Sequence, residues 1–237
     1  LLDVTGLSND LQMRVGQPAT REDLSRVHPA SYLDAFAKMS ANGGGELGLR
    51  TPFGAGGYDI AALSAGLAKA ALMDVLSGDL DNAYALSRPP GHHCLPDFPN
   101  GFCLLNNIGI AINAARAAGA ATRLAVLDWD VHYGNGTEAV FYDDPDVLTI
   151  SIHQDRNYPI DTGASVERGR GAGLGANLNI PLPAGTGHVG YLSAMDKLAL
   201  PAIRAFAPDV LIIACGFDAG ANDPLGACWP LPKPLVI

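Results

Sequence analysis

The segment Asp128-Trp129-Asp130-Val131-His132 contains the residue types of a metal site. Alternate side chains of an extended backbone point the same way, so Asp128, Asp130 and His132 can project together. Asp218 follows a separate apolar run and supplies another carboxylate. Two carboxylates and one imidazole, with a coordination position left open, suit a catalytic zinc ion. A strand end with a capping carboxylate would explain the first segment alone, whereas Asp218 favours the metal.

Two adjacent histidines, His92 and His93, follow the turn-forming sequence Pro89-Pro90-Gly91. Neighbouring residues do not share a face in regular structure, so both rings can reach one site only from a turn. A single histidine is usually structural, but a pair beside a metal site indicates acid–base chemistry. The other histidines are expected in packing, loop or site-supporting positions: His28, His153 and His188.

Short apolar runs alternate with helical patterns along the chain. Strands are predicted over residues 82–87, 123–127, 147–152 and 209–215. Helices are predicted from Thr20, which can cap with Asp23, and over residues 59–77, 104–118, 137–141 and 190–206. This alternation predicts an α/β fold in which a mainly parallel sheet has helices on both faces. The polar clusters follow the predicted strands, and the carboxyl ends of parallel strands are where such folds place their sites.

Length and composition set the broad class of the protein. A chain of 237 residues with 48% hydrophobic content suits one domain, residues 1–237. A net charge of −9 argues against non-specific nucleic-acid binding. An acidic surface could attract cationic substrates such as polyamines, but it is also usual for cytoplasmic proteins. Four scattered cysteines indicate reduced thiols, and the sequence has neither a secretory signal nor a run long enough to cross a membrane. We therefore expect a cytoplasmic protein.

Three long motifs carry a family resemblance: RPPGHHCLPDFPNGFCLLNNIGIA, LAVLDWDVHYGNGTEAVFYDDPDVLTISIH and PDVLIIACGFDAGANDPLG. In order and separation they resemble the arginase/deacetylase superfamily, and most closely the class II-like bacterial histone deacetylases and acetylpolyamine amidohydrolases. The resemblance covers residues 20–226. It implies a three-layer α/β/α fold with a central, mainly parallel sheet. The implied activity is zinc-dependent removal of acetyl or related acyl groups from lysine side chains or polyamines.

The resemblance also implies roles for individual residues. Its zinc ligands fall on Asp130, His132 and Asp218. Its catalytic histidines fall on His92 and His93, supported by Asp128 and Asn135 respectively. One structural potassium site would use Asp128, Asp130, His132, Ser151 and the carbonyl of Ile152, and a second alkali-ion site carbonyls around Phe141, Asp144 and Val147. The acyl-lysine tunnel would be lined by Gly101, Phe102, Tyr158 and Leu225.

The sequence departs from the family pattern at two places. Tyr133 stands where the family often has a second histidine, which should leave the zinc ligands intact. The chain ends in ACWPLPKPLVI, whereas the family continues to a glycine-rich loop bearing the residue that stabilises the oxyanion. We therefore expect a fold truncated at both ends, whose exposed apolar surface would favour homo-oligomers.

Other functions remain open at this level. A catalytically weak homologue that binds acyl-lysine or zinc is one alternative, and an acyl esterase is another. A manganese ureohydrolase would share the fold, but it needs a two-metal cluster, and tandem histidines before GFC are not its signature.

Overall fold

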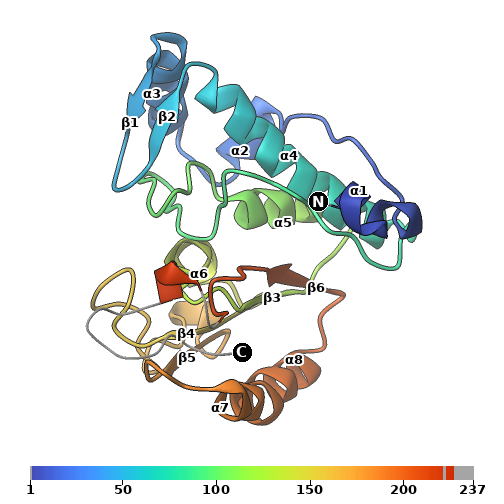
Figure 1. Ribbon diagram of the computed structural model, residues 1–237, viewed down its shortest axis with the longest axis vertical. Coiled ribbons are helices and arrows are strands. Elements are labelled where there is room, and N and C mark those ends of the chain that lie inside the picture. Colours follow the sequence, from blue (N-terminus) through green and yellow to red (C-terminus); the bar gives the residue numbers. More distant parts are fainter. Residues whose placement is uncertain (1, 221–222, 227–237) are drawn as a thin grey trace.

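The computed structural model describes residues 2–220 and 223–226. Its centre is a sheet of four parallel strands in the order β5-β4-β3-β6 (Figure 1). The strands are β3 (Leu124–Asp128), β4 (Val147–Gln154), β5 (Asn177–Leu182) and β6 (Val210–Ala214). Every residue of β3 and β4 is buried, as expected for strands that are covered on both faces.

Helices cover both faces of this sheet. On one face, Leu124 and Val126 pack in a core with residues of α4 (Gly57–Leu76) and α5 (Asn107–Ala117). On the other face, Leu127 and Ile150 pack with α7 (His188–Ala194) and α8 (Leu200–Phe206), which a π-helical turn, η3 (Met195–Ala199), joins. Figure 1 shows the sheet between these helical layers. The predicted three-layer α/β/α fold is therefore confirmed.

Further short elements surround the layers. Near the N-terminus lie α1 (Leu2–Thr5), the 3-10 turn η1 (Leu7–Asp10), α2 (Arg21–Ser25) and α3 (Ala30–Ala41). A two-stranded hairpin follows, formed by β1 (Gly44–Glu46) and β2 (Pro52–Gly54). The remaining elements are α6 (Asn135–Phe141), η2 (Gly171–Gly173) and η4 (Pro224–Gly226). The predicted capping of α2 is confirmed, because Thr20 and Asp23 form a reciprocal capping box.

One predicted strand is absent from the described residues, and one observed strand was not predicted. Residues 82–87 form no strand, and Tyr84 and Leu86 are 58% and 61% exposed. Their apolar alternation resembles a strand, but a strand needs a neighbouring strand to pair with. In the described sheet β6 pairs with β3 alone, and residues 82–87 do not pair with either edge. Conversely, β5 was missed because Asn177 and Asn179 interrupt its apolar pattern. Among the described helices, none is both long and apolar enough to cross a bilayer.

His28 joins the N-terminal helices to the loop that carries the histidine pair. Its Nδ1 donates to the carbonyl of Pro96 at 2.7 Å, and its Nε2 accepts the N–H of Asn106 at 3.0 Å. The ring is buried and both nitrogens are used by the neutral form. Burial lowers the pKa of His28 to about 4, although the Pro96 carbonyl opposes that shift.

Because the pKa of His28 is lowered in the folded state, we predict that the protein loses stability in acid. Between pH 6.5 and about 4 the unfolded chain binds a proton at His28 and the folded chain does not. The free energy of unfolding should therefore fall by up to about 3 kcal/mol as the pH drops through this window. Urea unfolding at several pH values measures it. His28→Gln should flatten this part of the profile, and His188→Gln, at an exposed position of α7, should not. Equal pH dependence in the wild type and His28→Gln would contradict the assignment.

Candidate active site

Three side chains that follow neighbouring strands converge at the carboxyl edge of the sheet. Asp130 and His132 follow β3, and Asp218 follows β6, which pairs with β3 in parallel register. One nitrogen or oxygen atom from each residue lies within 4.8 Å of the others. His132 Nδ1 is 2.9 Å from both Asp130 Oδ1 and Asp218 Oδ2. Gly216 allows this approach, because a Cβ there would lie 2.3 Å from Asp130 Oδ2.

The charges of this trio suit a divalent cation. Burial opposes a charge on His132, but hydrogen bonds to Asp130 and Asp218 outweigh it and raise its pKa to about 10. The positive charge of His132 thus balances the two carboxylates, a role that a divalent cation held by all three side chains would take over. Val131 N–H donates to Asp218 Oδ1 at 2.9 Å, which leaves Oδ2 directed toward His132. An Asp₂His set with room for further ligands fits zinc.

The histidine pair lies beside the trio, and each ring has its own acceptor. His92 Nδ1 contacts Asp128 Oδ2 at 2.8 Å, and His93 Nδ1 contacts Asn135 Oδ1 at 2.8 Å. The ring centroids are 3.9 Å apart. The first turn of α6 fixes the loop, because the N–H groups of Gly136 and Thr137 donate to the carbonyl of His92. The structure therefore brings together each histidine and the partner that the resemblance implied.

The pKa values of the two imidazoles shift in opposite directions. Burial opposes a charge on His92, yet the charges of Asp128 and Asp130 raise its pKa to about 9. Burial and then the neighbouring charge of His92 hold the pKa of His93 well below its usual range. An amide oxygen only accepts, so His93 Nδ1 must carry the proton that is shared with Asn135. His93 Nε2 is then a free base, in a ring whose centroid is 6.0 Å from that of His132.

One aromatic side chain, Tyr158, lies beside both His93 and His132. The Tyr158 ring meets His93 edge-on at 5.1 Å and His132 at 6.1 Å. Phe102 has a left-handed φ of 66° and is 55% exposed. Of the four tunnel residues inferred from sequence, Gly101 lies against the Tyr158 ring, and Phe102 follows Gly101 along the chain. Leu225 is exposed in η4, whose Gly226 approaches the Asp218 backbone, and its role in the tunnel stays a prediction.

Gly101 lies so close to His93 and Tyr158 that a side chain there would collide with both rings. It has a φ of 50°, and a Cβ there would lie 2.4 Å from His93 Cδ2 and 2.9 Å from Tyr158 Cε1. We predict that Gly101→Ala displaces His93 and lowers kcat/KM by about 100-fold, the cost of misplacing a reacting group by about 1 Å. Gly56→Ala is the matched control, because Gly56 has a φ of 75° but open space around it. Equal kinetics in the two variants would contradict this prediction.

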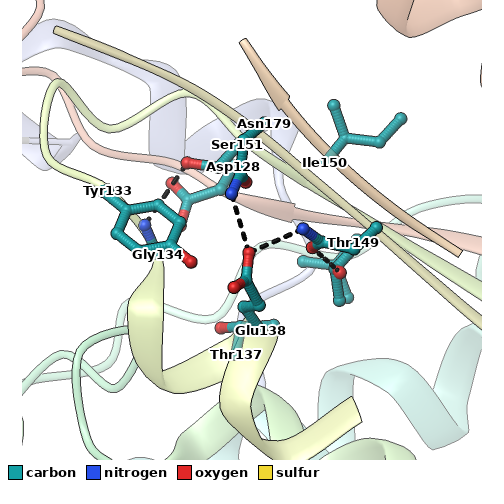
Figure 2. A pocket seen from close by; sticks show the side chains of 11 residues that line it. Asp128, Tyr133, Gly134, Thr137, Glu138, Thr149, Ile150, Ser151 and Asn179 are labelled. Carbon is teal, nitrogen blue, oxygen red and sulfur yellow. Dashed lines mark hydrogen bonds between the residues drawn. The ribbon is translucent and has the colours of Figure 1, made fainter. Parts of the chain in front are cut away.

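A small cavity of about 10 Å³ lies next to Asp128, lined by residues of β3, β4, β5 and α6 (Figure 2). Asp128 and Ser151, two of the residues inferred to hold potassium, line it. Ser151 Oγ contacts His153 Nδ1 at 3.0 Å, while His153 Nε2 donates to the carbonyl of Gly163. His153 Nδ1 must then accept from the hydroxyl, and Ser151 Oγ itself accepts the N–H of Gly134 at 3.3 Å, which leaves one lone pair for a cation.

Two buried oxygens of residues that line the cavity, Asn179 Oδ1 and Thr137 Oγ1, have no hydrogen-bond partner among the described residues. Glu138 shares the wall, and its Oε2 accepts from Asn177 at 2.6 Å and from Asn179 at 2.8 Å. Burial raises the pKa of Glu138 despite these bonds. Unpartnered oxygens near a buried carboxylate fit a hard monovalent cation. Sequence reasoning missed Glu138, Asn177 and Asn179, because no local pattern links α6 to β5.

The second predicted alkali-ion site involves the turn after α6. Asp144 N–H donates to the carbonyl of Phe141 at 2.9 Å, and the Asp144 carboxylate pairs with Arg116. Val147 begins β4 opposite Leu124. These contacts keep Phe141, Asp144 and Val147 within one tight segment, and cation binding by their carbonyls stays a prediction.

Comparison with known proteins gives a consistent picture. Residues 1–231 match the family model described as the histone deacetylase domain. The chain is 55% identical over 225 residues to a histone deacetylase-like amidohydrolase of Pseudomonas aeruginosa, and 40% identical over 217 residues to histone deacetylase 8 of Arabidopsis thaliana. These matches cover 95% and 89% of this chain but 59% and 57% of the relatives. The chain therefore spans less than two thirds of their length.

Two solved structures share the fold. The HDA15 HD domain superposes with a TM-score of 0.91 at 37% identity, over 96% of this chain and 67% of that one. An acetylpolyamine aminohydrolase from Burkholderia pseudomallei superposes with a TM-score of 0.85 at 34% identity, over 94% of this chain and 74% of that one.

Proposed function

Because the chain belongs to the histone deacetylase family, we propose that it is a zinc-dependent amidohydrolase that removes acetyl or related acyl groups from lysine side chains or polyamines. One observation carries the proposal: the Asp130, His132 and Asp218 trio lies beside a neutral histidine with a free Nε2. Zinc held by the trio would polarise an acyl carbonyl and acidify a water molecule.

The residues of the chain then divide the remaining work. His93 Nε2 takes a proton from the attacking water, while Asn135 holds the ring in the tautomer that leaves Nε2 free. His92, kept protonated beside Asp128, adds positive charge close to the reacting amide. The histidine pair returns a proton to the leaving amine.

The flanking rings select the shape of the substrate. Phe102 and Tyr158 would enclose a thin alkyl chain and keep water away from the amide. A lysine side chain and a polyamine both have such a chain. Monovalent cations in the cavity beneath Asp128 would stabilise the carboxylates that hold the site.

The test is acetate release from an acetyl-lysine peptide, an N-acetylpolyamine and an acetyl ester, with the affinity for the peptide measured alongside. Zinc-dependent turnover of either amide supports the proposal. Affinity for the peptide without hydrolysis would favour a weak acyl-lysine-binding homologue, and ester cleavage alone would favour an acyl esterase. Either result would overturn amide hydrolysis as the function.

A further inference from the structure

The aromatic wall of the site rests on the loop that contains Arg50. Gly101 N–H donates to the carbonyl of Leu49 at 3.1 Å, and Phe102 N–H donates to the carbonyl of Arg50 at 2.9 Å. Two successive backbone hydrogen bonds therefore fix the position of Arg50 relative to Phe102. Arg50 itself has a left-handed φ of 58°, so this loop is held in a specific conformation at the outer end of the site.

The guanidinium of Arg50 lies against the second wall. Its central carbon is 5.5 Å from the centre of the Tyr158 ring, the ring that meets His93 edge-on. His93 is buried whereas Arg50 is exposed, so Tyr158 spans the distance between the reacting groups and solvent. Any part of a substrate that extends out past Phe102 and Tyr158 would emerge beside this cation.

No ion pair engages the Arg50 guanidinium among the described residues. The nearby Glu46 carboxylate accepts the N–H of Thr51 instead. The protein as a whole is acidic, with a net charge of −9, which by itself would attract cationic carriers. The charge of Arg50 at the mouth outweighs exposed charges elsewhere on the protein, because salt screens interactions between exposed charges that lie more than about 8–10 Å apart.

We propose that Arg50 determines carrier specificity: the site favours acyl-lysine flanked by carboxylates over polycationic carriers such as polyamines or lysine-rich segments. This rests on the proposed function and narrows its substrate class. The carboxylate would pair with the Arg50 guanidinium at the mouth while the acyl-lysine chain lies between Phe102 and Tyr158. A cationic carrier would meet like charge at the same point.

The test uses three acetyl-lysine peptides that differ only in the flanking residues, Glu, Gln or Lys, with both kcat/KM and affinity by fluorescence anisotropy measured. An exposed charge pair predicts a preference for the Glu peptide over the Gln peptide of about two- to fivefold. Arg50→Gln should remove the preference, Arg50→Lys should keep it, and Arg50→Glu should reverse it. A change in Tyr158 packing would alter the rates for all three peptides alike, so it cancels in the ratio of their kcat/KM values. Added salt should shrink the ratio.

Arg204→Gln is the matched control, because Arg204 is an exposed residue near the end of α8, before the amino edge of β6 and away from the site. It should leave the ratio unchanged. Equal rates and affinities for the three peptides in the wild type, or the same loss of preference in Arg204→Gln, would overturn the inference while leaving deacylation intact. A chain that hydrolyses neither these peptides nor an N-acetylpolyamine would overturn the proposed function and the inference with it.

Discussion

His93→Ala should lower kcat for an acetyl-lysine peptide by about 10²–10⁴-fold, the range that general acid–base catalysis contributes. The reason is specific to its hydrogen bond. Asn135 Oδ1 can only accept, so His93 carries its proton on Nδ1 and presents Nε2 as a base. Alanine offers no group that could take the proton of the attacking water. Steady-state kinetics on the purified variant measures the loss.

Structural damage must be separated from lost chemistry in that variant. Zinc content should stay close to wild type, because His93 is not among the three side chains that could hold a metal. His188→Ala, at an exposed position of α7, should behave as wild type. Asn135→Ala should flatten or shift the pH profile of kcat, since it frees the tautomer of His93. A near-normal kcat in His93→Ala would remove this histidine from the reaction.

Asp218→Ala should lose both zinc and turnover. Asp218 contributes one of two carboxylates around His132, and its Oδ2 lies 2.9 Å from His132 Nδ1. Altering a group that only supports a metal ligand costs about 10–100-fold in affinity, so removing a ligand should cost more than about 100-fold. Metal analysis after dialysis, with kinetics on the same sample, measures both effects.

The control for Asp218→Ala is Asp196→Ala, which removes an exposed carboxylate on the helical layer of α7 and α8. It should retain zinc and activity. If the Asp218→Ala variant keeps its zinc, the zinc binds at another place in the protein. A variant that loses zinc but keeps turnover would show that hydrolysis is independent of this site.

The sequence predicted which polar side chains lie close together better than it predicted which segments form strands. Asp130, His132 and Asp218 follow runs that are apolar throughout, and such runs form buried parallel strands whose carboxyl ends meet. The adjacent histidines were informative because Pro89-Pro90-Gly91 must form a turn. In these cases short-range rules determine where a side chain points.

The errors arose where structure depends on distant partners. Residues 82–87 have a strand-like composition but no ladder partner, and β5 has two asparagines but a partner in β4. Asn177 and Asn179 are polar because they bond Glu138 of α6, a contact that only the assembled fold creates. The position of Arg50 against Tyr158 likewise depends on tertiary packing and leaves no local pattern.

The most direct test of zinc-dependent deacylation is hydrolysis of a fluorogenic acetyl-lysine peptide by the wild-type chain as isolated, after chelation, and after zinc is restored. Each sample is also assayed for bound metal. Metal held by Asp130, His132 and Asp218 predicts about one zinc per chain, loss of turnover on chelation and recovery when zinc returns. Turnover that survives complete removal of zinc, or a zinc-loaded chain that does not hydrolyse the peptide, would contradict it.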